Sequence, residues 1–517
     1  MKTIRIFDTT LRDGEQAAGG SLTIDEKMEI GRQLQRLGVT VIEAGFPSTS
    51  PGDFEAVQLM SRELRDVEIA ALSGYGENLV EKTWEALKEA ERPLLHTVIS
   101  TSDNHLKSQL KMSRKDVLEL TKRTVTFSRQ LVPHVEFSAM DATRSDPAFV
   151  AQVLGVAVAA GATVVNIPDT VGYTMPEEFE ELIGYCMENV PGISEVIVSV
   201  HCHDDLGHAA ANSLAGVRMG ATQIECTING VGERAGNASL EEIVMALRTR
   251  QDFYNADTAI KSEEIYRASR ITSNYMGMPV PPNKAVVGSN AFAHSSGLHQ
   301  DGMLKDRSTY EIMKAEDVGQ AQSKIVLGKF SGRHAFRNHL SSMGIDFEDD
   351  TEFQHAFDTF KRVADRKKEI TDRDVEAIVQ DRLHRSIEEK YRLELLQVQC
   401  GTSGVPTATV RLKTPDGSTV EDAALGDGPV DAVYKAITRI VDMPVTLTEF
   451  AISAVTEDTD AIGEVTIRVV SGNRTATGYG ADTDIVVASA HAFVNGLNRL
   501  ATESAIVGSD ERQAASV

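Results

Sequence analysis

The stretch EVIVSVHCHDDLGHAAANS, residues 195–213, carries the pattern on which the fold depends. An apolar run rich in Val and Ile ends in two histidines and two aspartates, and a helical segment follows. A short, continuous apolar run is typical of a parallel strand that is buried on both faces. The stretch therefore predicts one strand–helix unit, with polar side chains gathered where the strand ends.

Seven further apolar runs in the first 250 residues repeat this unit. The eight predicted strands are 3–8, 39–45, 67–73, 94–100, 134–139, 163–168, 195–201 and 222–228. Amphipathic segments lie between them, among them 23–38, 77–91 and 176–190. Eight units spaced about 30 residues apart predict an α/β fold, the (β/α)₈ or TIM barrel, which takes about 250 residues. A doubly wound sheet is the alternative, but the even spacing favours a closed barrel.

The repeat stops after about residue 270, and two further regions follow. Residues 276–302 are rich in Pro and Gly, which indicates an ordered loop or linker, and helical segments continue to about 390. Four strand patterns and two helix patterns then alternate; the strands are 392–400, 407–414, 449–455 and 463–471, and the helices 429–442 and 485–500. We therefore expect a barrel domain (1–270), a helical linker region (271–390) and a C-terminal α+β domain (391–517) with its own core.

Composition excludes several classes of partner. The 517 residues carry a formal net charge of -24, which disfavours nucleic acid and anionic membrane surfaces because phosphates would be repelled. An anionic substrate would need a local cation or metal. Four cysteines without a CxxC pair suit a reducing cytosol, and we find neither a signal peptide nor an apolar run of the roughly 18 residues that span a membrane. These features predict a cytoplasmic protein.

Polar residues collect where the predicted strands end, which is where a barrel of this kind has its active site. The first strand runs into Asp8, Arg12, Asp13 and Glu15, and the second ends in Glu43. The later strands carry His96, then Glu136 and Ser138, then NIPDTVGY (166–173), then His201 to Asp205, and finally Glu233, Arg234 and Asn237.

The strongest chemical signal is the pair His201 and His203. Residues i and i+2 of a strand point to the same side, so both imidazoles face one way and Cys202 faces the other. The pair either caps hydrogen bonds or binds a divalent metal, and its place at a strand end favours the metal. Asp13 is the first candidate for an oxygen ligand. A mixed N/O site suits Mn²⁺, Mg²⁺, Zn²⁺ or Co²⁺, whereas the cysteines are wrongly placed for structural zinc.

Arg12, next to Asp13, is either a solvated charge or ion-pair partner, or a cation that stabilises an oxyanion on a metal-bound carbonyl. The glycines of NGVGERAGN, residues 229–237, lack the GxGxxG spacing of a dinucleotide site, so no nucleotide is predicted. Arg12 and the histidine pair thus favour metal-assisted carbonyl chemistry.

Several motifs closely resemble the 2-isopropylmalate synthase family, one branch of the metal-dependent barrels that make or break C–C bonds next to a carbonyl. The barrel motifs are FDTTLRDGEQ (7–16), NIPDTVGYTMP (166–176), HCHDDLGHA (201–209), NGVGERAGNASLEE (229–242) and, in the linker, AFAHSSGLHQDG (291–302). The C-terminal motifs are GDGPVDAVYKAI (426–437) and TDIVVASAHA (483–492). The resemblance covers nearly the whole chain, although homocitrate synthases, citramalate synthases and related lyases share the barrel motifs.

The resemblance assigns roles to individual residues. It implies that the metal ligands are Asp13, His201, His203 and Asn237, and that Arg12 stabilises the enolate and alkoxide oxygens. It implies that the keto-acid pocket is lined by Leu72, His96, Ser138 and Thr170. His299 is the implied catalytic histidine, reaching the barrel of a partner subunit, with Tyr310 as its companion.

The resemblance also implies a reaction and its partners. Acetyl-CoA would condense with 3-methyl-2-oxobutanoate (2-oxoisovalerate) to give (2S)-2-isopropylmalate and CoA, the first committed step of leucine biosynthesis. Mn²⁺ is the favoured metal, K⁺ is a candidate activator, and a homodimer is expected. The alternatives are a citramalate synthase that uses pyruvate, and a leucine sensor without catalytic activity.

The C-terminal domain resembles a leucine-binding regulatory module. Its glycine-rich turn, GDGPVDA (426–432), precedes a helix pattern, so backbone N–H groups there could receive a carboxylate. We expect Gly426, Gly428 and Asp431 to take part in binding leucine, the feedback inhibitor. The alternative is that the turn only caps its helix and the domain only supports a dimer.

One residue departs from the family pattern. In VEFSAMDATRSD (135–146), Met140 stands where many relatives carry a glutamate. Methionine cannot accept a proton, and the neighbouring Asp141 is expected to face the other way on a strand. Either the glutamate is dispensable, or a neighbouring residue takes its place.

Overall fold

The computed structural model describes residues 1–321, 324–347, 349–365, 367, 370–372, 374–375, 378–379, 390–401, 404–441, 443–454, 463–472 and 474–514. These residues fall into two compact units. The first comprises Met1–Ala293 and Glu311–Lys324, and the second comprises His294–Tyr310 and the chain from Ile325 onward.

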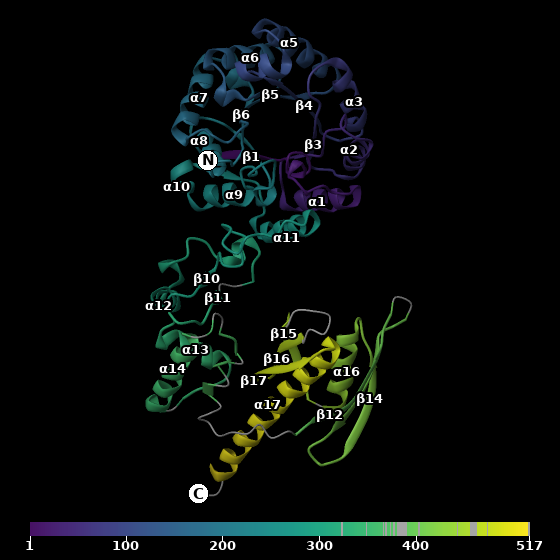
Figure 1. The fold of residues 1–517 in the computed structure, drawn as a ribbon, viewed down its shortest axis with the longest axis vertical. Coiled ribbons are helices and arrows are strands. Elements are labelled where there is room, and N and C mark those ends of the chain that lie inside the picture. The colour runs from purple at the N-terminus through teal and green to yellow at the C-terminus, as the bar shows by residue number, and fades with distance from the viewer. Residues whose placement is uncertain are drawn as a thin grey trace. The chain divides into compact units, whose positions relative to one another are not determined.

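The first unit is a closed parallel barrel, drawn in Figure 1 as a ring of strands inside a ring of helices. Its strands follow chain order: β1 (Lys2–Asp8), β2 (Val41–Glu43), β3 (Glu68–Leu72), β4 (Pro93–Ser100), β5 (His134–Met140), β6 (Val164–Asp169), β7 (Ile197–Cys202) and β8 (Gln223–Cys226). Because β1 pairs in parallel with both β8 and β2, the sheet closes on itself. The predicted barrel is confirmed, and the doubly wound sheet is excluded.

Helices follow the strands and cover the outside of the barrel (Figure 1). The main ones are α1 (Ile24–Leu37), α2 (Pro51–Glu63), α3 (Glu77–Leu87), α5 (Arg114–Leu131), α6 (Pro147–Ala160), α7 (Pro176–Asn189), α8 (Ala209–Arg218) and α9 (Leu240–Thr249). Their ends follow local chemistry. Thr23 and Glu26 form a capping box at the start of α1, and Gly38, with φ 88°, ends it in the left-handed region.

The first unit also contains α4 (Asp103–His105), α10 (Gln251–Tyr254) and α11 (Ile265–Met276). A further strand, β9 (Ala256–Thr258), pairs with β1 in parallel and was not expected from the sequence, because three residues carry too little pattern. A continuous apolar core joins the strands to the helices around them and includes Ile6, Ile69, Val135, Val200 and Leu240.

The second unit begins with α12 (Gly297–Lys305), α13 (Arg333–Ser342) and α14 (Asp350–Ala364). Phe336, Phe353 and Phe360 are buried together in a small core between α13 and α14. Two short strands, β10 (Ala293–His294) and β11 (Lys324–Ile325), form a separate pair.

The C-terminal part of this unit has two antiparallel three-stranded sheets. They contain β12 (Arg392–Gln399), β13 (Thr407–Lys413) and β14 (Thr419–Leu425), and then β15 (Thr446–Ala454), β16 (Gly463–Ser471) and β17 (Arg474–Asp482). Helices α16 (Pro429–Val441) and α17 (Ile485–Ala514) share their core. The predicted α+β class is confirmed. The strands β14 and β17 were missed because β14 is largely exposed and β17 is rich in Gly and Thr.

The packing of α17 on β17 depends on two glycines of that strand. A Cβ atom at Gly478 or Gly480 would lie 2.1 Å from a backbone oxygen of α17. A larger residue at either position would therefore push the helix off the sheet. Within the described residues, no helix is both long enough and apolar enough to cross a membrane.

Candidate metal centre and active site

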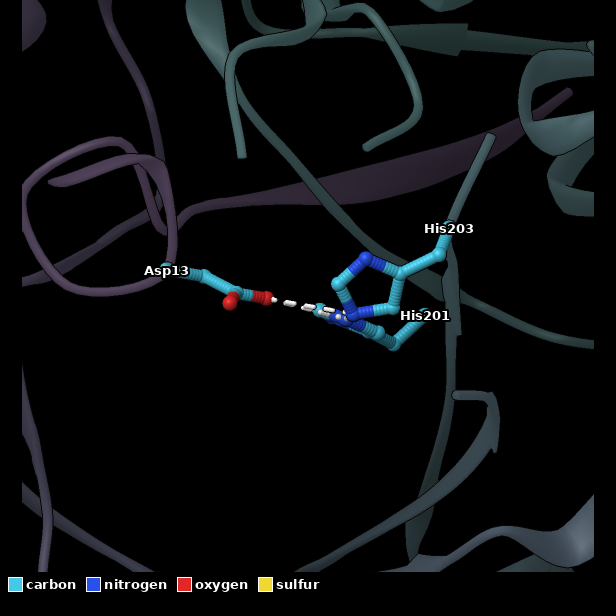
Figure 2. Close-up of side chains that lie close together, drawn as sticks. All are labelled: Asp13, His201 and His203. Carbon is cyan, nitrogen blue, oxygen red and sulfur yellow. Dashed lines mark hydrogen bonds and ion pairs between the residues drawn. The ribbon is translucent and has the colours of Figure 1, made fainter. Parts of the chain in front are cut away.

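Asp13, His201 and His203 converge at the mouth of the barrel (Figure 2). Asp13 lies in the turn after β1, where its N–H donates to the carbonyl of Thr9 at 2.9 Å. His201 belongs to β7, and His203 follows directly. Asp13 Oδ2 lies 3.2 Å from His201 Nε2 and 3.6 Å from His203 Nε2. The prediction from strand alternation, that both imidazole rings point to the same side of β7, is therefore confirmed.

The three side chains fit a divalent metal. The two Nε2 atoms face each other at 3.2 Å, and both histidines are 6% exposed. Two nitrogen lone pairs and a carboxylate oxygen cannot approach this closely without a shared cation, either a proton or a metal. Neutral imidazole and carboxylate are the ligand types that Mn²⁺, Mg²⁺, Zn²⁺ and Co²⁺ accept. The site therefore has the donors of a divalent-metal centre.

Without a metal, one proton would take the place of that cation. Burial alone lowers the pKa of His201, but hydrogen bonds to Asp13 and Glu225 outweigh it and raise the pKa to about 10. Burial and the neighbouring His201 cation lower the pKa of His203 to about 4. The pair thus holds a single positive charge in this state, and metal binding displaces a proton.

Asn237, the fourth predicted ligand, lies beside Asp13. Its Nδ2 donates to Asp13 Oδ2 at 2.9 Å, and its Oδ1 is buried without a hydrogen-bond partner. A Cβ atom at Gly232 would lie 2.1 Å from that Oδ1, so only glycine leaves room for the amide. A half-turn of the amide brings its oxygen to the metal side, and Asn237 is within reach as a ligand.

Glu225 orients the His201 ring by a hydrogen bond to Nδ1, the ring nitrogen that does not face Asp13. Its Oε2 lies 2.8 Å from His201 Nδ1, which fixes the tautomer that presents Nε2 to the metal position. Glu225 was not predicted from the sequence, although a signal was present: Gln223 and Glu225 of β8, and Thr227 directly after it, alternate with apolar residues. Polar residues at i, i+2 and i+4 indicate a polar side facing the barrel interior.

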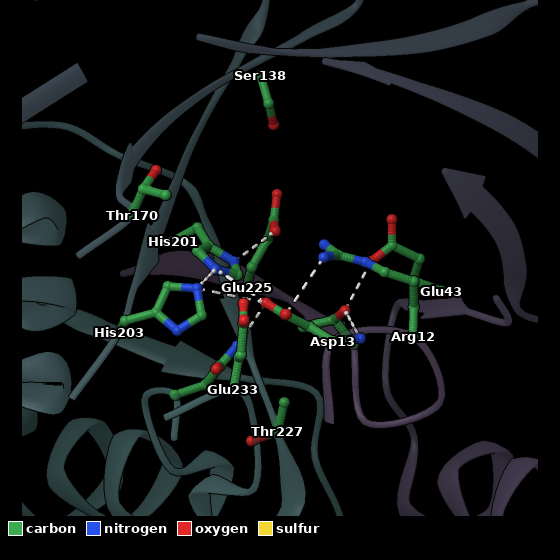
Figure 3. Close-up of polar contacts among 12 residues, drawn as sticks. Arg12, Asp13, Glu43, Ser138, Thr170, His201, His203, Glu225, Thr227 and Glu233 are labelled. Atoms are coloured by element: carbon green, nitrogen blue, oxygen red, sulfur yellow. Dashed lines mark hydrogen bonds and ion pairs between the residues drawn. The ribbon is translucent and has the colours of Figure 1, made fainter. Parts of the chain in front are cut away.

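Arg12 contacts both Asp13, a candidate metal ligand, and Glu43 of β2 (Figure 3). Its Nη1 lies 3.4 Å from Asp13 Oδ1, and its Nε donates to Glu43 Oε2 at 2.6 Å. Burial alone would lower the pKa of Arg12, but Glu43 and Asp13 raise it above the ordinary value. Arg12 therefore carries a fixed positive charge at the barrel mouth, where it can stabilise an oxyanion.

The four predicted pocket residues lie on, or directly after, the neighbouring strands β3 to β6. Leu72 ends β3, directly opposite His96 of β4, and Ser138 lies near the end of β5. Thr170 follows β6, and its Oγ1 accepts a hydrogen bond from Asp141 N at 2.9 Å. His96 Nε2 lies 2.7 Å from Ser138 Oγ. The barrel thus brings all four to the same end as the metal ligands.

Asp141 does not stand in for the glutamate that is absent at Met140. Its backbone has φ 63°, in the left-handed region, and its carboxylate forms a bidentate pair with Arg144 at 2.7 and 2.8 Å. Met140 itself ends β5 on the face that carries Ser138. The acceptor for a proton at this strand must therefore be another side chain.

His299 and Tyr310 lie together in the second unit. Their rings are stacked, with centroids 4.0 Å apart. His299 is exposed, and Tyr310 is 40% exposed. The structure thus pairs these two predicted residues with each other, within a unit separate from the barrel.

The predicted regulatory turn caps its own helix. Asp431 accepts a hydrogen bond from Asp427 N at 2.9 Å and forms an ion pair with Lys435. Gly428 O accepts from Ala432 N, and a Cβ atom at Gly426 would lie 2.3 Å from that same N. The glycine at 426 is thus needed for a tight turn. These contacts favour the capping role at this turn over a direct contact with leucine.

The fold and the site together define a class: a (β/α)₈ barrel with a buried Asp–His–His metal centre and a cation beside it. Family models agree with this class. Residues 3–272 match the HMGL-like family, residues 286–368 the homocitrate synthase post-HMGL domain-like family, and residues 369–501 the LeuA allosteric (dimerisation) domain.

Full-length relatives narrow the class to one family. The chain is 54% identical to a 2-isopropylmalate synthase of Microcystis aeruginosa, covering 96% of this chain and 95% of the relative. It is also 54% identical to a 2-isopropylmalate synthase of Carboxydothermus hydrogenoformans, covering 97% and 98%. A Syntrophus aciditrophicus enzyme of the same name is 51% identical, with 96% of each chain covered. The chain belongs to the 2-isopropylmalate synthase family.

Proposed function

We propose that this protein condenses acetyl-CoA with 3-methyl-2-oxobutanoate to give (2S)-2-isopropylmalate and CoA. The observation that carries the proposal is the Asp13–His201–His203 cluster with Arg12 beside it, in a chain of this family. The 2-oxo acid would bind at the barrel mouth, in a pocket lined by Leu72, His96, Ser138 and Thr170, which lie on or directly after β3 to β6. Leu72 offers the apolar surface that a branched side chain needs.

Asp13, His201, His203 and Asn237 would hold the metal, and Mn²⁺ is the proposed first candidate among the metals that mixed N/O donors accept. When bound, the metal would act as a Lewis acid on the keto group. Arg12 donates hydrogen bonds to the oxygen that becomes negative as the C–C bond forms. K⁺ remains a candidate activator.

His299 is the proposed base that removes a methyl proton from acetyl-CoA, with Tyr310 stacked on it. Both lie in the second unit. On the family resemblance, we propose that they act in the barrel site of a partner subunit in a homodimer. Leucine would be the feedback inhibitor, bound by the C-terminal domain that matches the LeuA allosteric (dimerisation) family. The proposed divisions are 1–270 for the catalytic barrel, 271–390 for the linker and 391–517 for the regulatory domain.

The cytosol is the proposed location. Cys186, Cys202 and Cys226 are buried free thiols, and Cys400 is exposed and free. Unpaired thiols suit a reducing compartment.

A thiol-release assay tests the proposed activity. CoA release should be fastest with 3-methyl-2-oxobutanoate, slower with pyruvate and slowest with 2-oxoglutarate, and a chelator should abolish it. Pyruvate as the best acceptor would instead indicate a citramalate synthase. No release with any acceptor, together with saturable leucine binding, would favour a sensor.

A further inference from the structure

Next to the metal centre, three side chains form a separate hydrogen-bonded chain. Ser138 Oγ lies 2.7 Å from His96 Nε2, and His96 Nδ1 lies 2.6 Å from Glu43 Oε1. The exposed fractions of Ser138, His96 and Glu43 are 4%, 2% and 0%. A hydroxyl, an imidazole and a carboxylate in this order are the arrangement with which hydrolases activate an oxygen nucleophile.

The carboxylate end of this chain sets the direction of its hydrogen bonds. Burial alone would raise the pKa of Glu43, but Arg12 and His96 outweigh it and lower the pKa to about 2. Glu43 is therefore ionised and can only accept hydrogen bonds. It accepts from Arg12 Nε and Thr9 Oγ1, both at 2.6 Å, on Oε2, which leaves Oε1 to accept from His96 Nδ1.

When the His96 ring carries one proton, on the Nδ1 that faces Glu43, the lone pair of its Nε2 points at Ser138 Oγ. Ser138 donates its O–H to that lone pair, and its oxygen accepts from Asn166 Nδ2 at 2.8 Å. A hydroxyl oxygen has two acceptor positions, so Ser138 Oγ keeps one for a further donor. A water molecule that donates there would be joined to His96 through Ser138.

The reaction proposed above requires such a group. Condensation leaves a thioester that must be hydrolysed, and Met140, which shares the face of β5 with Ser138, cannot accept a proton. Figure 3 shows Ser138 and Glu43 around the same space as Arg12 and His201. The chain Ser138–His96–Glu43 thus lies at the barrel end where the thioester forms.

We propose that Ser138, His96 and Glu43 form a proton relay that activates the water which hydrolyses the thioester intermediate. The inference rests on the proposed function. The water oxygen adds to the thioester carbonyl carbon, its proton passes to Ser138 Oγ, and the Ser138 proton passes to His96 Nε2. When the C–S bond breaks, the imidazolium returns its proton to the CoA sulfur. The product carboxylic acid loses its own proton to solvent.

Rapid-quench experiments on the full-length Ser138→Ala enzyme test the relay. Condensation is followed by mass spectrometry of the CoA thioester of 2-isopropylmalate, and hydrolysis by free CoA thiol. We expect the variant to accumulate the thioester, with hydrolysis slowed roughly 10²–10⁴-fold, the usual contribution of a general base. Condensation should also slow, because Ser138 lines the proposed keto-acid pocket, but hydrolysis should slow further, so that the thioester still accumulates. If condensation and CoA release fall together and no thioester accumulates, the relay is overturned.

Ser199→Ala is the matched control. Ser199 is a fully buried serine on β7 whose Oγ accepts from Gln223 Nε2, outside the relay. The Ser199→Ala enzyme should not accumulate the thioester, because hydrolysis should keep pace with condensation. Uncoupling of equal size in this control would show that any buried serine of the barrel has the effect, which also overturns the relay.

A second variant separates this inference from the proposed function. The thioester of 2-isopropylmalate is supplied ready-made to unaltered and His96→Ala enzymes, so no condensation is needed. The unaltered enzyme should hydrolyse it, His96→Ala should lose this activity, and added imidazole should restore part of it. An unaltered enzyme that hydrolyses the thioester but never condenses its precursors would count against the proposed function alone. Hydrolysis that persists in His96→Ala without imidazole would overturn the relay alone.

Discussion

Two pairs of aromatic side chains, one in each unit, differ sharply in how they are held. His201 and His203 are 6% exposed and are fixed by Asp13 and Glu225. His299 and Tyr310 are stacked at 4.0 Å but exposed, with Tyr310 at 40%. The barrel thus builds its metal centre from its own residues, whereas the linker presents its pair on a surface.

The first prediction removes a barrel ligand and has the largest expected effect. His203→Ala should lower metal-dependent CoA release by more than about 100-fold, because losing even an outer partner of a metal ligand costs roughly 10–100-fold. Metal content, measured on the purified protein, should fall with it. His134, at the start of β5, is exposed and serves as the control: His134→Ala should keep both CoA release and metal content. Full activity of His203→Ala after chelation and return of Mn²⁺ would refute the assignment.

The second prediction concerns the linker pair. His299→Ala and Arg12→Ala should each be inactive, but a mixture should recover activity if a barrel uses the His299 of its partner. Random exchange in a two-fold dimer makes half of the molecules hybrid, each with one intact site, so about a quarter of full activity should return. Native mass spectrometry checks the exchange. A mixture that exchanges subunits but stays inactive would place both residues in one subunit's site.

The third prediction concerns the C-terminal domain. Deleting residues from 392 onward should remove leucine inhibition while the barrel stays folded, as checked by circular dichroism. Coupling between linked sites is typically about 1–3 kcal/mol, so leucine should shift the substrate affinity of the full chain roughly 5–150-fold. Calorimetry on the full and shortened chains should show leucine binding only to the full chain. Inhibition that survives the deletion would move the effector site into the barrel or linker.

The smallest expected effect is a pH dependence of stability that arises in the barrel. Burial raises the pKa of Asp8 to about 7, despite hydrogen bonds from Thr10 that lower it. The folded barrel thus favours the neutral form of Asp8. Ionisation of Asp8 therefore does not affect the free energy of unfolding at pH values below its ordinary pKa. Between that pKa and pH 7, the free energy of unfolding falls as pH rises. In the second unit, by contrast, hydrogen bonds lower the pKa of Asp372 and Asp431.

Asp8→Asn tests this contrast. The amide keeps a neutral group of the same shape, so the variant should be more stable than the unaltered protein at pH 8, by an amount on the order of a few kcal/mol. The difference should shrink towards pH 4. Urea unfolding at several pH values measures it. An equal difference at pH 4 and pH 8 would show that the substitution acts through packing and not through ionisation.

The barrel was predictable because its signals are local. Each strand is a continuous apolar run, and the eight runs recur at even intervals, so periodicity alone indicated closure. The shared side of His201 and His203 followed from strand alternation for the same reason. The strands β9, β14 and β17 were missed because they are short, exposed or rich in small residues, and their pairing is decided by neighbours rather than by their own pattern.

The site was only partly predictable. Asn237 was suggested by family resemblance, not by its spacing, and it meets Asp13 from 224 positions away in the chain. Glu225 carried a visible alternation signal but no indication that it would orient His201. Glu43 was visible as a strand end, yet its bonds to Arg12 and His96 depend on the strand order β1–β2–β3–β4 in the closed sheet.

The sequence by itself determined the number and order of the barrel strands, the side on which each strand residue points, and the chemical types available at the strand ends. These properties depend on residues close together in the chain. Only the tertiary structure decided which carboxylate meets the two histidines, which one aligns His96 with Ser138, and that Asp141 turns away to Arg144. The first choice depends on closing the sheet between β1 and β8, because closure brings the turn after β1 close to the end of β7. The second depends on the strand order β2–β3–β4–β5, and the third on the left-handed backbone at Asp141.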